Sequence, residues 1–246
     1  MEVVSAVTIA DIEKAADRLA GVALQTPLEL SHYLSEKYGA HIWLKREDQQ
    51  VTRSYKIRGA YNKLSMESDG QKTVLAASAG NHAQGVAYAC NLLNRKGVIF
   101  MPLTTPKQKI EQAQFFGGQH IDIQLVGDNF DDAYQAAKEY YEQHDACFIP
   151  PFDDADIICG QGTVGLEIIR QMDAPIDYLL LPIGGGGLSA GVSTVFKSNS
   201  ASTTIIGVEP TGAPAMAKAF EAGHPVTLDA IDPFVDGAAV RRIGEL

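Results

Sequence analysis

The sequence has few cysteines and no long apolar run, and these absences limit the classes of protein it can belong to. Cys90, Cys147 and Cys159 are odd in number and include no CxxC pair, so neither a disulfide framework nor a zinc site is predicted. We expect buried free thiols, which suit a reducing cytoplasm. No apolar run reaches membrane-spanning length, and no basic residue precedes the apolar residues 3–10, unlike in a signal peptide. The sequence predicts a soluble, cytoplasmic protein.

Positive charge is also scarce. The chain has 20 Lys and Arg against 30 Asp and Glu, for a net charge of −10. A nucleic acid or an anionic membrane would need a basic face, so we expect neither partner and look for a small molecule instead. The six histidines are scattered without an HxxxH pair, and no metal site is predicted.

Hydrophobic periodicity predicts two α/β units in a chain long enough, at 246 residues, for one large or two ordinary domains. Strands and helices alternate as in parallel sheets with right-handed crossovers. The Pro- and Asp-rich residues 145–156 are the predicted boundary, and Thr8 with Asp11 predicts a capping box for a first helix. The predicted strands are 41–45, 73–77, 97–101, 121–126, 147–149, 178–183 and 204–208, and the later helices are 31–38, 81–93, 106–116, 129–144, 156–172 and 188–196.

A candidate reactive group is Lys56, which lies in the stretch SYKIRGA between a charged, strand-like run and a helix. An amine attacks carbonyl compounds only when unprotonated, and desolvation or neighbouring cations lower its pKa. Lys45, Arg46, Arg53 and Arg58 are close in sequence, so we expect a lowered pKa. Most lysines are solvated surface residues, and the spacing alone leaves that alternative open.

A run of four glycines follows an apolar strand and opens a helix. Bare backbone amides at a helix N-terminus form an anion site suited to a phosphate group, although a flexible turn has the same composition. The pattern GxGxxA, which ends at Ala190 and is followed by Glu209 at the end of the next strand, also fits a dinucleotide-binding unit. This stretch alone does not decide between a nicotinamide cofactor and another phosphate ligand. Its residues are Gly184, Gly185, Gly186, Gly187 and Leu188.

A second strand-to-helix junction has small residues that would let a ligand approach the backbone amides and the Asn81 side chain. It suits a carboxylate, but Asn81 and His82 are also ordinary helix-capping residues. The residues of this junction are Ser78, Ala79, Gly80, Asn81 and His82.

Three motifs, SYKIRGAYN, ASAGNHAQGVA and IGGGGLSAG, occur in this order and together resemble the fold-type II pyridoxal-phosphate enzymes, specifically the threonine dehydratases with their serine dehydratase and serine racemase relatives. The resemblance covers residues 9–246 and includes TPLELS, WLKRED, FMPLTTPKQK, FVDGA and IIGVEP. It implies an α/β fold, similar to the tryptophan synthase β chain, with two open, mainly parallel twisted sheets flanked by helices. It also implies a larger cofactor-binding domain (residues 1–52 and 150–246) and a smaller α/β domain (residues 53–149).

The resemblance assigns roles to the three stretches. Lys56 would hold the aldehyde of pyridoxal 5'-phosphate as a Schiff base, Tyr55 would line the cofactor face, and Asn81 would hydrogen-bond the 3-oxygen. Gly184–Leu188 would bind the phosphate and Ser78–His82 the substrate carboxylate. The implied reaction is dehydration and deamination of L-threonine to 2-oxobutanoate and ammonia, a step towards isoleucine or in threonine breakdown, with Lys56 as the general base.

Two positions refine the choice within the group. The racemase relatives resemble this chain but have a serine where it has Ala79, and a methyl group cannot return a proton, so dehydration is favoured over racemisation. In the racemase-like pattern an acid follows the GVEP glutamate by six positions and helps to bind a divalent cation. Here that position is Ala215, so no such site is predicted from Glu209.

The family's catalytic domain continues past the FVDGA motif, whereas this sequence stops at Leu246. The resemblance therefore predicts that part of the sheet cover, and a serine facing the pyridine nitrogen, are missing, which would expose apolar surface. The alternatives left open are a serine racemase or serine dehydratase, a nicotinamide-dependent enzyme, and an inactive remnant. The family implies a homodimer or tetramer.

Overall fold

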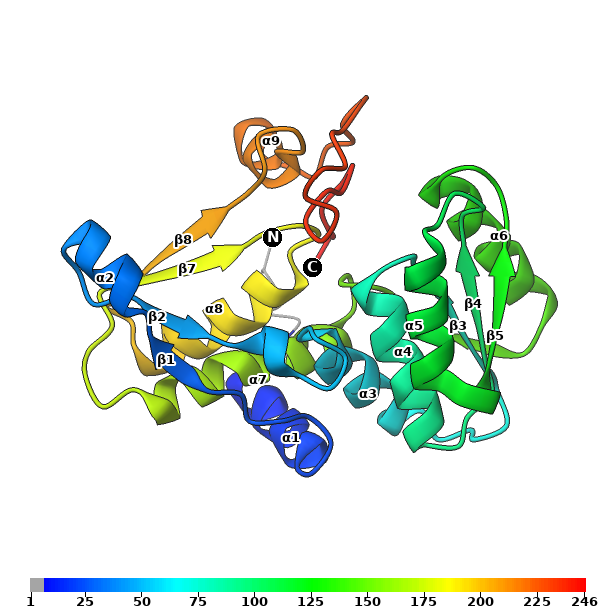
Figure 1. Ribbon diagram of the computed structural model, residues 1–246, viewed down its shortest axis with the longest axis horizontal. Helices are drawn as coiled ribbons and strands as arrows, with labels where there is room; N and C mark the ends of the chain where they lie inside the picture. The colour runs from blue at the N-terminus through cyan, green and yellow to red at the C-terminus, as the bar shows by residue number, and fades with distance from the viewer. Residues whose placement is uncertain (1–6) are drawn as a thin grey trace.

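The computed structural model describes residues 7–246, which form two bodies with helix α3 (Lys56–Met66) between them (Figure 1). Thr8 caps the first helix as predicted, because its hydroxyl accepts from the amide of Asp11 while the Asp11 carboxylate accepts from the Thr8 amide. No helix among the described residues is long and apolar enough to cross a lipid bilayer.

The body on the right of Figure 1 is built on a four-stranded parallel sheet with the strand order β5-β4-β3-β6. Its side chains alternate between the two faces: Val74 and Ala76 pack with α4 and α5, whereas Leu75 and Ala77 pack with α6. Both faces are covered by helices, as a parallel sheet requires. The elements are β3 (Thr73–Ala77), β4 (Gly97–Met101), β5 (Ile121–Leu125), β6 (Ala146–Phe148), α4 (Asn81–Leu92), α5 (Lys107–Gly117), η2 (Gly118–His120) and α6 (Phe130–Gln143).

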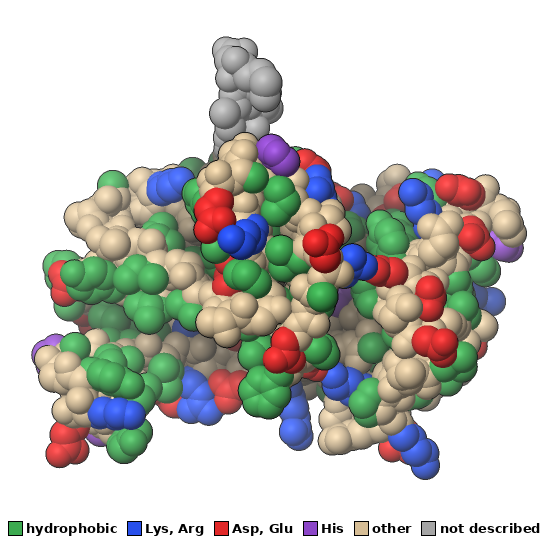
Figure 2. Space-filling model, turned by 90° about the horizontal axis from the view of Figure 1, so that it is seen from above, with side chains coloured by type: hydrophobic (Ala, Val, Ile, Leu, Met, Phe, Trp, Pro, Cys, Tyr) green, Lys and Arg blue, Asp and Glu red, His purple; other side chains and the backbone are tan. Residues whose placement is uncertain are grey.

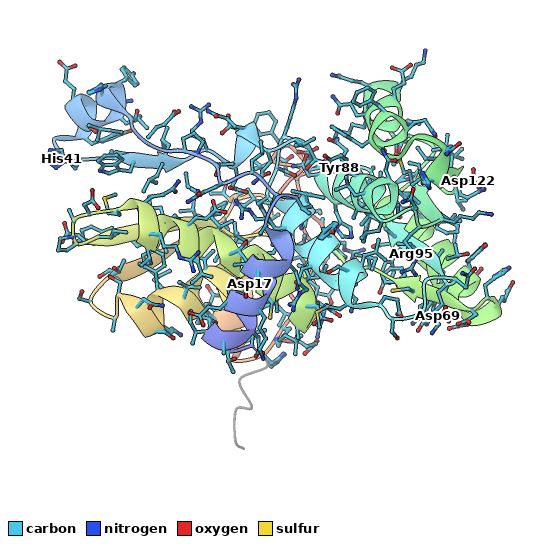
Figure 3. All side chains as sticks on the ribbon, turned by 90° about the horizontal axis from the view of Figure 1, so that it is seen from below. Asp17, His41, Asp69, Tyr88, Arg95 and Asp122 are labelled. Atoms are coloured by element: carbon cyan, nitrogen blue, oxygen red, sulfur yellow. The ribbon has the colours of Figure 1, made fainter. Side chains whose placement is uncertain are left out.

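One side chain fastens the loop that enters this sheet. Arg95, after α4, donates from Nη2 to the carbonyl oxygens of Asp69 (2.8 Å) and Lys72 (3.1 Å). Figure 3 shows Arg95 and Asp69 on the same side of the body. The loop between α3 and β3 is thereby tied to the end of α4.

The second body packs three helices against two short sheets. Helices α1, α7 and α8 share an apolar cluster that includes Ile12, Ile158 and Val195. Leu179 and Leu181 of β7 pack on the other side of α7 and α8. The elements are α1 (Ile9–Leu19), α7 (Ala155–Gln171), α8 (Gly187–Asn199) and α9 (Ala215–Ala222), the parallel pair β7 (Tyr178–Pro182) and β8 (Thr204–Val208), the antiparallel pair β1 (Leu28–Leu30) and β2 (Trp43–Lys45), α2 (His32–Tyr38) and η1 (Glu47–Gln49).

The outer face of the β7–β8 pair is uncovered within residues 7–246. Its register places Leu180 beside Ile206 and Pro182 beside Val208, and Leu180 is 63% exposed. Figure 2 shows hydrophobic side chains gathered on the left of the molecule, over these strands. We call the set the open β7–β8 face; it comprises Tyr178, Leu180, Ile206 and Val208.

The predicted elements are largely confirmed. The strands at residues 73–77 and 204–208 have the predicted bounds, and the helices from α4 to α7 begin and end within one residue of prediction. Strand β1 and helix α9 were not predicted, and the strand expected from His41 begins only at Trp43. A three-residue strand is defined by its partner, here the antiparallel β2, which local sequence does not reveal.

The backbones of α3, α7 and α8 approach one another at glycines. A Cβ atom on Gly160 would lie 2.6 Å from the Cα atom of Gly59, and one on Gly191 would lie 2.4 Å from the carbonyl oxygen of Ile158 and 2.7 Å from the amide nitrogen of Gly162. Side chains at these positions would force the helices apart. The glycines therefore set how closely α3, the helix that carries Lys56, approaches α7, and how closely α7 approaches α8.

We expect Gly191→Ala to lower the free energy of unfolding by about 1–3 kcal/mol, because the added methyl group meets backbone atoms that cannot rotate away. The better helix propensity of alanine, about 1 kcal/mol, only partly offsets this. Urea unfolding measures the change. The control is Gly237→Ala, where a Cβ atom would have no neighbour within 4 Å. Equal stability of the two variants would contradict close helix packing at Gly191.

Candidate active site

The amine of Lys56 lies at the start of α3, where it is shielded from water. Lys56 Nζ donates a 2.6 Å hydrogen bond to the carbonyl oxygen of Pro151 and lies 5.5 Å from the ring centroid of Tyr55. Burial lowers the pKa of Lys56 to about 8 and raises the pKa of the Tyr55 hydroxyl to about 12. A sizeable fraction of the amine is therefore unprotonated near neutral pH, as a nucleophile requires.

The expected lowering of the Lys56 pKa is present, but the cations close to Lys56 in the sequence are not its cause. Burial alone accounts for it. Arg58, two positions along the helix, points to another side and is bound by Glu47 (2.8 Å) and Glu167 (2.6 Å). Lys45 also pairs with Glu167, at 2.5 Å. The positive charges of Arg58 and Lys45 are therefore neutralised by carboxylates in a buried network that does not include Lys56.

The glycine loop presents a row of free amide groups at the N-terminus of α8. The preceding amide, of Ile183, donates to Val208 in the β7–β8 pair, and the first intrahelical bond is from Ala190 to the carbonyl oxygen of Gly186. Between them, the amides of residues 184–188 donate to no group in the described part of the chain. Gly186 adopts φ +103°, which favours glycine. Such a loop can hold a phosphate group.

The N-terminus of α4 forms a second set of free amides. Ser78 Oγ accepts from the amide of Gly80 at 3.2 Å and so tightens the turn. The amides of Ala79, Asn81 and His82 donate to no group between residues 7 and 246. Asn81 is exposed, and no hydrogen bond from its side chain lies within that part of the chain. This junction can accept a carboxylate.

His82 differs from its neighbours because its side chain points inward. The ring is 4% exposed, and Nε2 donates to the carbonyl oxygen of Ile149 at 2.8 Å. Burial, with the nearby Lys56 charge, lowers the pKa of His82 to about 3. The ring is therefore neutral, and its visible contact is with the protein backbone.

Helices α3 and α4 bring these parts together. A Cβ atom on Gly85 would lie 3.0 Å from the carbonyl carbon of Lys56, so the first turn of α3 rests directly on α4. On the other side, a Cβ atom on Gly185 would lie 2.3 Å from the ring of Phe152. The segment Ile149–Phe152 therefore contacts His82, Lys56 and the glycine loop in turn.

The C-terminal residues also contact the glycine loop. The amide of Gly244 donates to the carbonyl oxygen of Gly185 at 3.0 Å, and the amides of Glu245 and Leu246 donate to the carboxylate of Asp153. Ala238 lies against Gly184. Residues 238–246 thus contact the glycine loop in addition to Phe152.

Glu209 has a structural partner. Its carboxylate accepts hydrogen bonds from the amides of Met216 (2.7 Å) and Ala217 (2.8 Å) at the start of α9. It therefore caps that helix and is not free to bind a ribose hydroxyl, as the dinucleotide alternative would need.

Sequence reasoning missed Pro151 and Phe152. Both act through backbone or packing contacts with residues about 30 to 95 positions away, which local motifs do not encode. One signal was present. Two successive prolines directly after a strand give a rigid segment without amide donors, whose carbonyl groups can still accept hydrogen bonds.

Comparison with known proteins identifies the family to which this chain is similar. Residues 19–246 match the family model described as "Pyridoxal-phosphate dependent enzyme". The biosynthetic L-threonine dehydratases of Halalkalibacterium halodurans and Bacillus subtilis are each 50% identical to it; each match covers 98% of this chain and 58% of the relative. The chain therefore spans less than two thirds of the length of these relatives.

Solved structures have the same fold. The processed form of threonine deaminase isoform 2 from Solanum lycopersicum superposes with a TM-score of 0.91 at 46% identity, covering 96% of this chain and 64% of that one. Maize serine racemase superposes with a TM-score of 0.91 at 32% identity, covering 98% and 72%.

Proposed function

Because this chain belongs to the pyridoxal-phosphate dependent enzyme family, we propose that it acts on L-threonine, releasing 2-oxobutanoate and ammonia. The family confirms the predicted fold class and the predicted cofactor, pyridoxal 5'-phosphate. The family assignment therefore favours a pyridoxal-phosphate enzyme over the nicotinamide-dependent enzyme that the sequence left open. The observation that supports the proposal most is the shielded Lys56 amine beside two helix N-termini with free amides.

The residues present fit the cofactor. The amides of residues 184–188 match a phosphate group in number and charge. Ser54 Oγ, two positions before Lys56, is buried and has no hydrogen-bond partner in the described residues, which is costly unless a ligand or water satisfies it. Lys56 supplies an amine with a pKa of about 8. We propose that Lys56 holds the aldehyde, Gly184–Leu188 the phosphate and Asn81 the 3-oxygen, with Tyr55 along the ring.

When bound, the cofactor supplies an electron-withdrawing ring that stabilises negative charge at the substrate α-carbon. The free amides of Ala79, Asn81 and His82, with the Ser78 turn and Gly80, bind the substrate carboxylate and orient the α-hydrogen. Once the incoming substrate amine has displaced it from the aldehyde, the freed Lys56 amine would remove the α-proton as general base. Its protonated form can return the proton to the departing β-hydroxyl group.

Two similar solved structures are named for different reactions: one is a threonine deaminase and the other is a serine racemase. Ala79 supports elimination, because its methyl group cannot deliver a proton to the face opposite Lys56. Threonine and serine differ by one methyl group, which a pocket distinguishes by only about 1–3 kcal/mol. We therefore expect serine to be a poorer second substrate.

The test is oxo-acid release by the purified 246-residue chain with pyridoxal phosphate and L-threonine. Chiral analysis of residual L-serine in a parallel reaction detects racemisation. Formation of 2-oxobutanoate without D-serine supports the proposal. Cofactor capture without any product would instead favour an inactive remnant, and D-serine formation would favour a racemase.

The reactivity of Lys56 should depend on pH in a defined range. Burial lowers the pKa of Lys56 to about 8. Below that pH, the rate of reaction with the cofactor aldehyde is proportional to the small fraction of Lys56 that is unprotonated. We expect the rate of pyridoxal phosphate capture to rise about tenfold per pH unit below pH ~8 and to level off above it. Stopped-flow absorbance measures the rate, with Nα-acetyl-lysine as the control. A rate that still rises at pH 10 would mean an unshifted amine.

Three further assignments belong to the proposal. The division into a larger domain (residues 1–52 and 150–246) and a smaller one (residues 53–149) is supported by the separate sheets on either side of α3. The three buried free cysteines suit a cytoplasmic location. A homodimer or tetramer is the expected assembly, which sedimentation can measure.

A further inference from the structure

The segment Ile149–Phe152 contacts every part of the candidate site. It begins on the sheet, where the amide of Ile149 donates to the carbonyl oxygen of Leu75 at 2.8 Å. It ends at Phe152, whose ring lies against the bare α-carbon of Gly185. Pro150 and Pro151 stand between these two anchors and have fixed φ angles and no amide hydrogen. Their backbone can therefore offer acceptors in a nearly fixed direction but cannot compete as a donor.

Two carbonyl groups of this segment are used by side chains of the site. Ile149 O accepts from His82 Nε2 at 2.8 Å, and Pro151 O accepts from Lys56 Nζ at 2.6 Å. Ile149 is fully buried and His82 is 4% exposed. Because a carbonyl oxygen can only accept, Nε2 carries a hydrogen. Burial lowers the pKa of His82 to about 3, so the ring is neutral and Nδ1 is unprotonated.

We propose that His82 and the Ile149–Phe152 segment form a positioning device for the Lys56 amine, and that the His82 ring is not a ligand of the substrate carboxylate. This inference rests on the proposed function. His82 and the sheet hydrogen bond of the Ile149 amide hold the start of the segment, Phe152 holds its end against the glycine loop, and the Pro151 carbonyl accepts from Nζ between them. The amine is thereby kept at a set position relative to both sets of free amides, and small displacements of a reacting group cost large factors in rate.

The geometry distinguishes this role from carboxylate binding. A histidine that bound a carboxylate through its ring would turn a hydrogen-bearing nitrogen towards the ligand. Here the hydrogen-bearing nitrogen is committed to Ile149 O inside the protein. The amide group of His82, in contrast, is free at the helix N-terminus and keeps its place in the carboxylate site.

The experiment measures capture of pyridoxal phosphate by Lys56 in the cofactor-free 246-residue chain, with borohydride trapping at timed intervals and mass spectrometry of the Lys56 peptide. Loss of one buried hydrogen bond predicts that His82→Leu slows capture about tenfold. His82→Gln places an amide donor near the position of Nε2 and should remain within about threefold of the parent chain. The matched control is Gln84→Leu, on the same helix but bonded to Gln112, which should not slow capture.

A second readout needs no cofactor. Competitive acetylation compares Lys56 with the exposed lysines of the same molecule, and His82→Leu should change the relative rate for Lys56 alone. A folded His82→Leu chain with parental capture and acetylation rates overturns the inference. If that variant does not fold, the capture rate is measured for Pro151→Ala instead. Freeing the φ angle at residue 151 should slow capture of pyridoxal phosphate, and an unchanged rate overturns the inference. Absence of any Lys56 adduct in the parent chain would contradict the proposed function, whereas the acetylation comparison would still test the positioning device.

Discussion

Replacing Lys56 with alanine is expected to abolish oxo-acid formation, with a loss in kcat of at least about 10³-fold. On the proposed assignment the variant loses both the group that holds the cofactor and the general base, and a general base alone typically contributes 10²–10⁴-fold. The Lys56 amine donates to the carbonyl oxygen of Pro151 at 2.6 Å, whereas the amine of Lys45, which is also shielded, is paired with the carboxylate of Glu167. A coupled assay of 2-oxobutanoate measures the loss of turnover. Mass spectrometry after borohydride reduction measures the loss of the covalently attached cofactor.

The matched control is Lys107→Ala, because the Lys107 side chain is 89% exposed and pairs with Glu111 one turn away. It should keep parental turnover and a single adduct on Lys56. A Lys56→Ala chain that still carried a covalently bound, coloured cofactor on another lysine and turned over amino acid would overturn the assignment.

The largest expected effect on stability comes from Glu167→Leu. Glu167 accepts two hydrogen bonds from the Arg58 guanidinium, at 2.6 and 3.0 Å, and one from Lys45 Nζ at 2.5 Å. Arg58 is 1% exposed, so removing this carboxylate leaves buried positive charge with only Glu47 to balance it. Breaking a buried ion pair costs about 3–5 kcal/mol, which for a chain of this size lowers Tm by about 10 °C.

Calorimetry or circular dichroism measures that shift. The control is Glu29→Gln, since Glu29 is the half-exposed partner of Arg46 and such surface pairs contribute less than about 1 kcal/mol. Equal Tm values for the two variants would mean that the buried network does not stabilise the fold.

The sequence predicted the central motifs because each is local. A strand, a glycine run and a helix start are encoded by neighbouring residues, so the loop at Gly184–Leu188 and the junction at Ser78–His82 could be recognised directly. Resemblance to a family then joined three stretches that are far apart in the chain. No local property of any one stretch placed them together.

The sequence could not show which way individual side chains point. Arg58 was expected to act on Lys56 because the two are close in the chain, yet residues two positions apart on a helix point to different sides, and Arg58 turns towards Glu47 and Glu167. His82 was likewise grouped with its neighbours, while its ring turns inward to Ile149. Both directions depend on which helix packs on which, and that is a tertiary property.

The open β7–β8 face has a practical consequence for handling the protein. Two adjacent strands present Tyr178, Leu180, Ile206 and Val208 to solvent, and each strand has one edge without a partner in the described residues. Surfaces of this kind attract one another. We expect the apparent molar mass of the isolated chain, measured by light scattering, to rise with protein concentration. Replacing Leu180 with lysine should reduce this rise, and the change touches neither Lys56 nor the glycine loop.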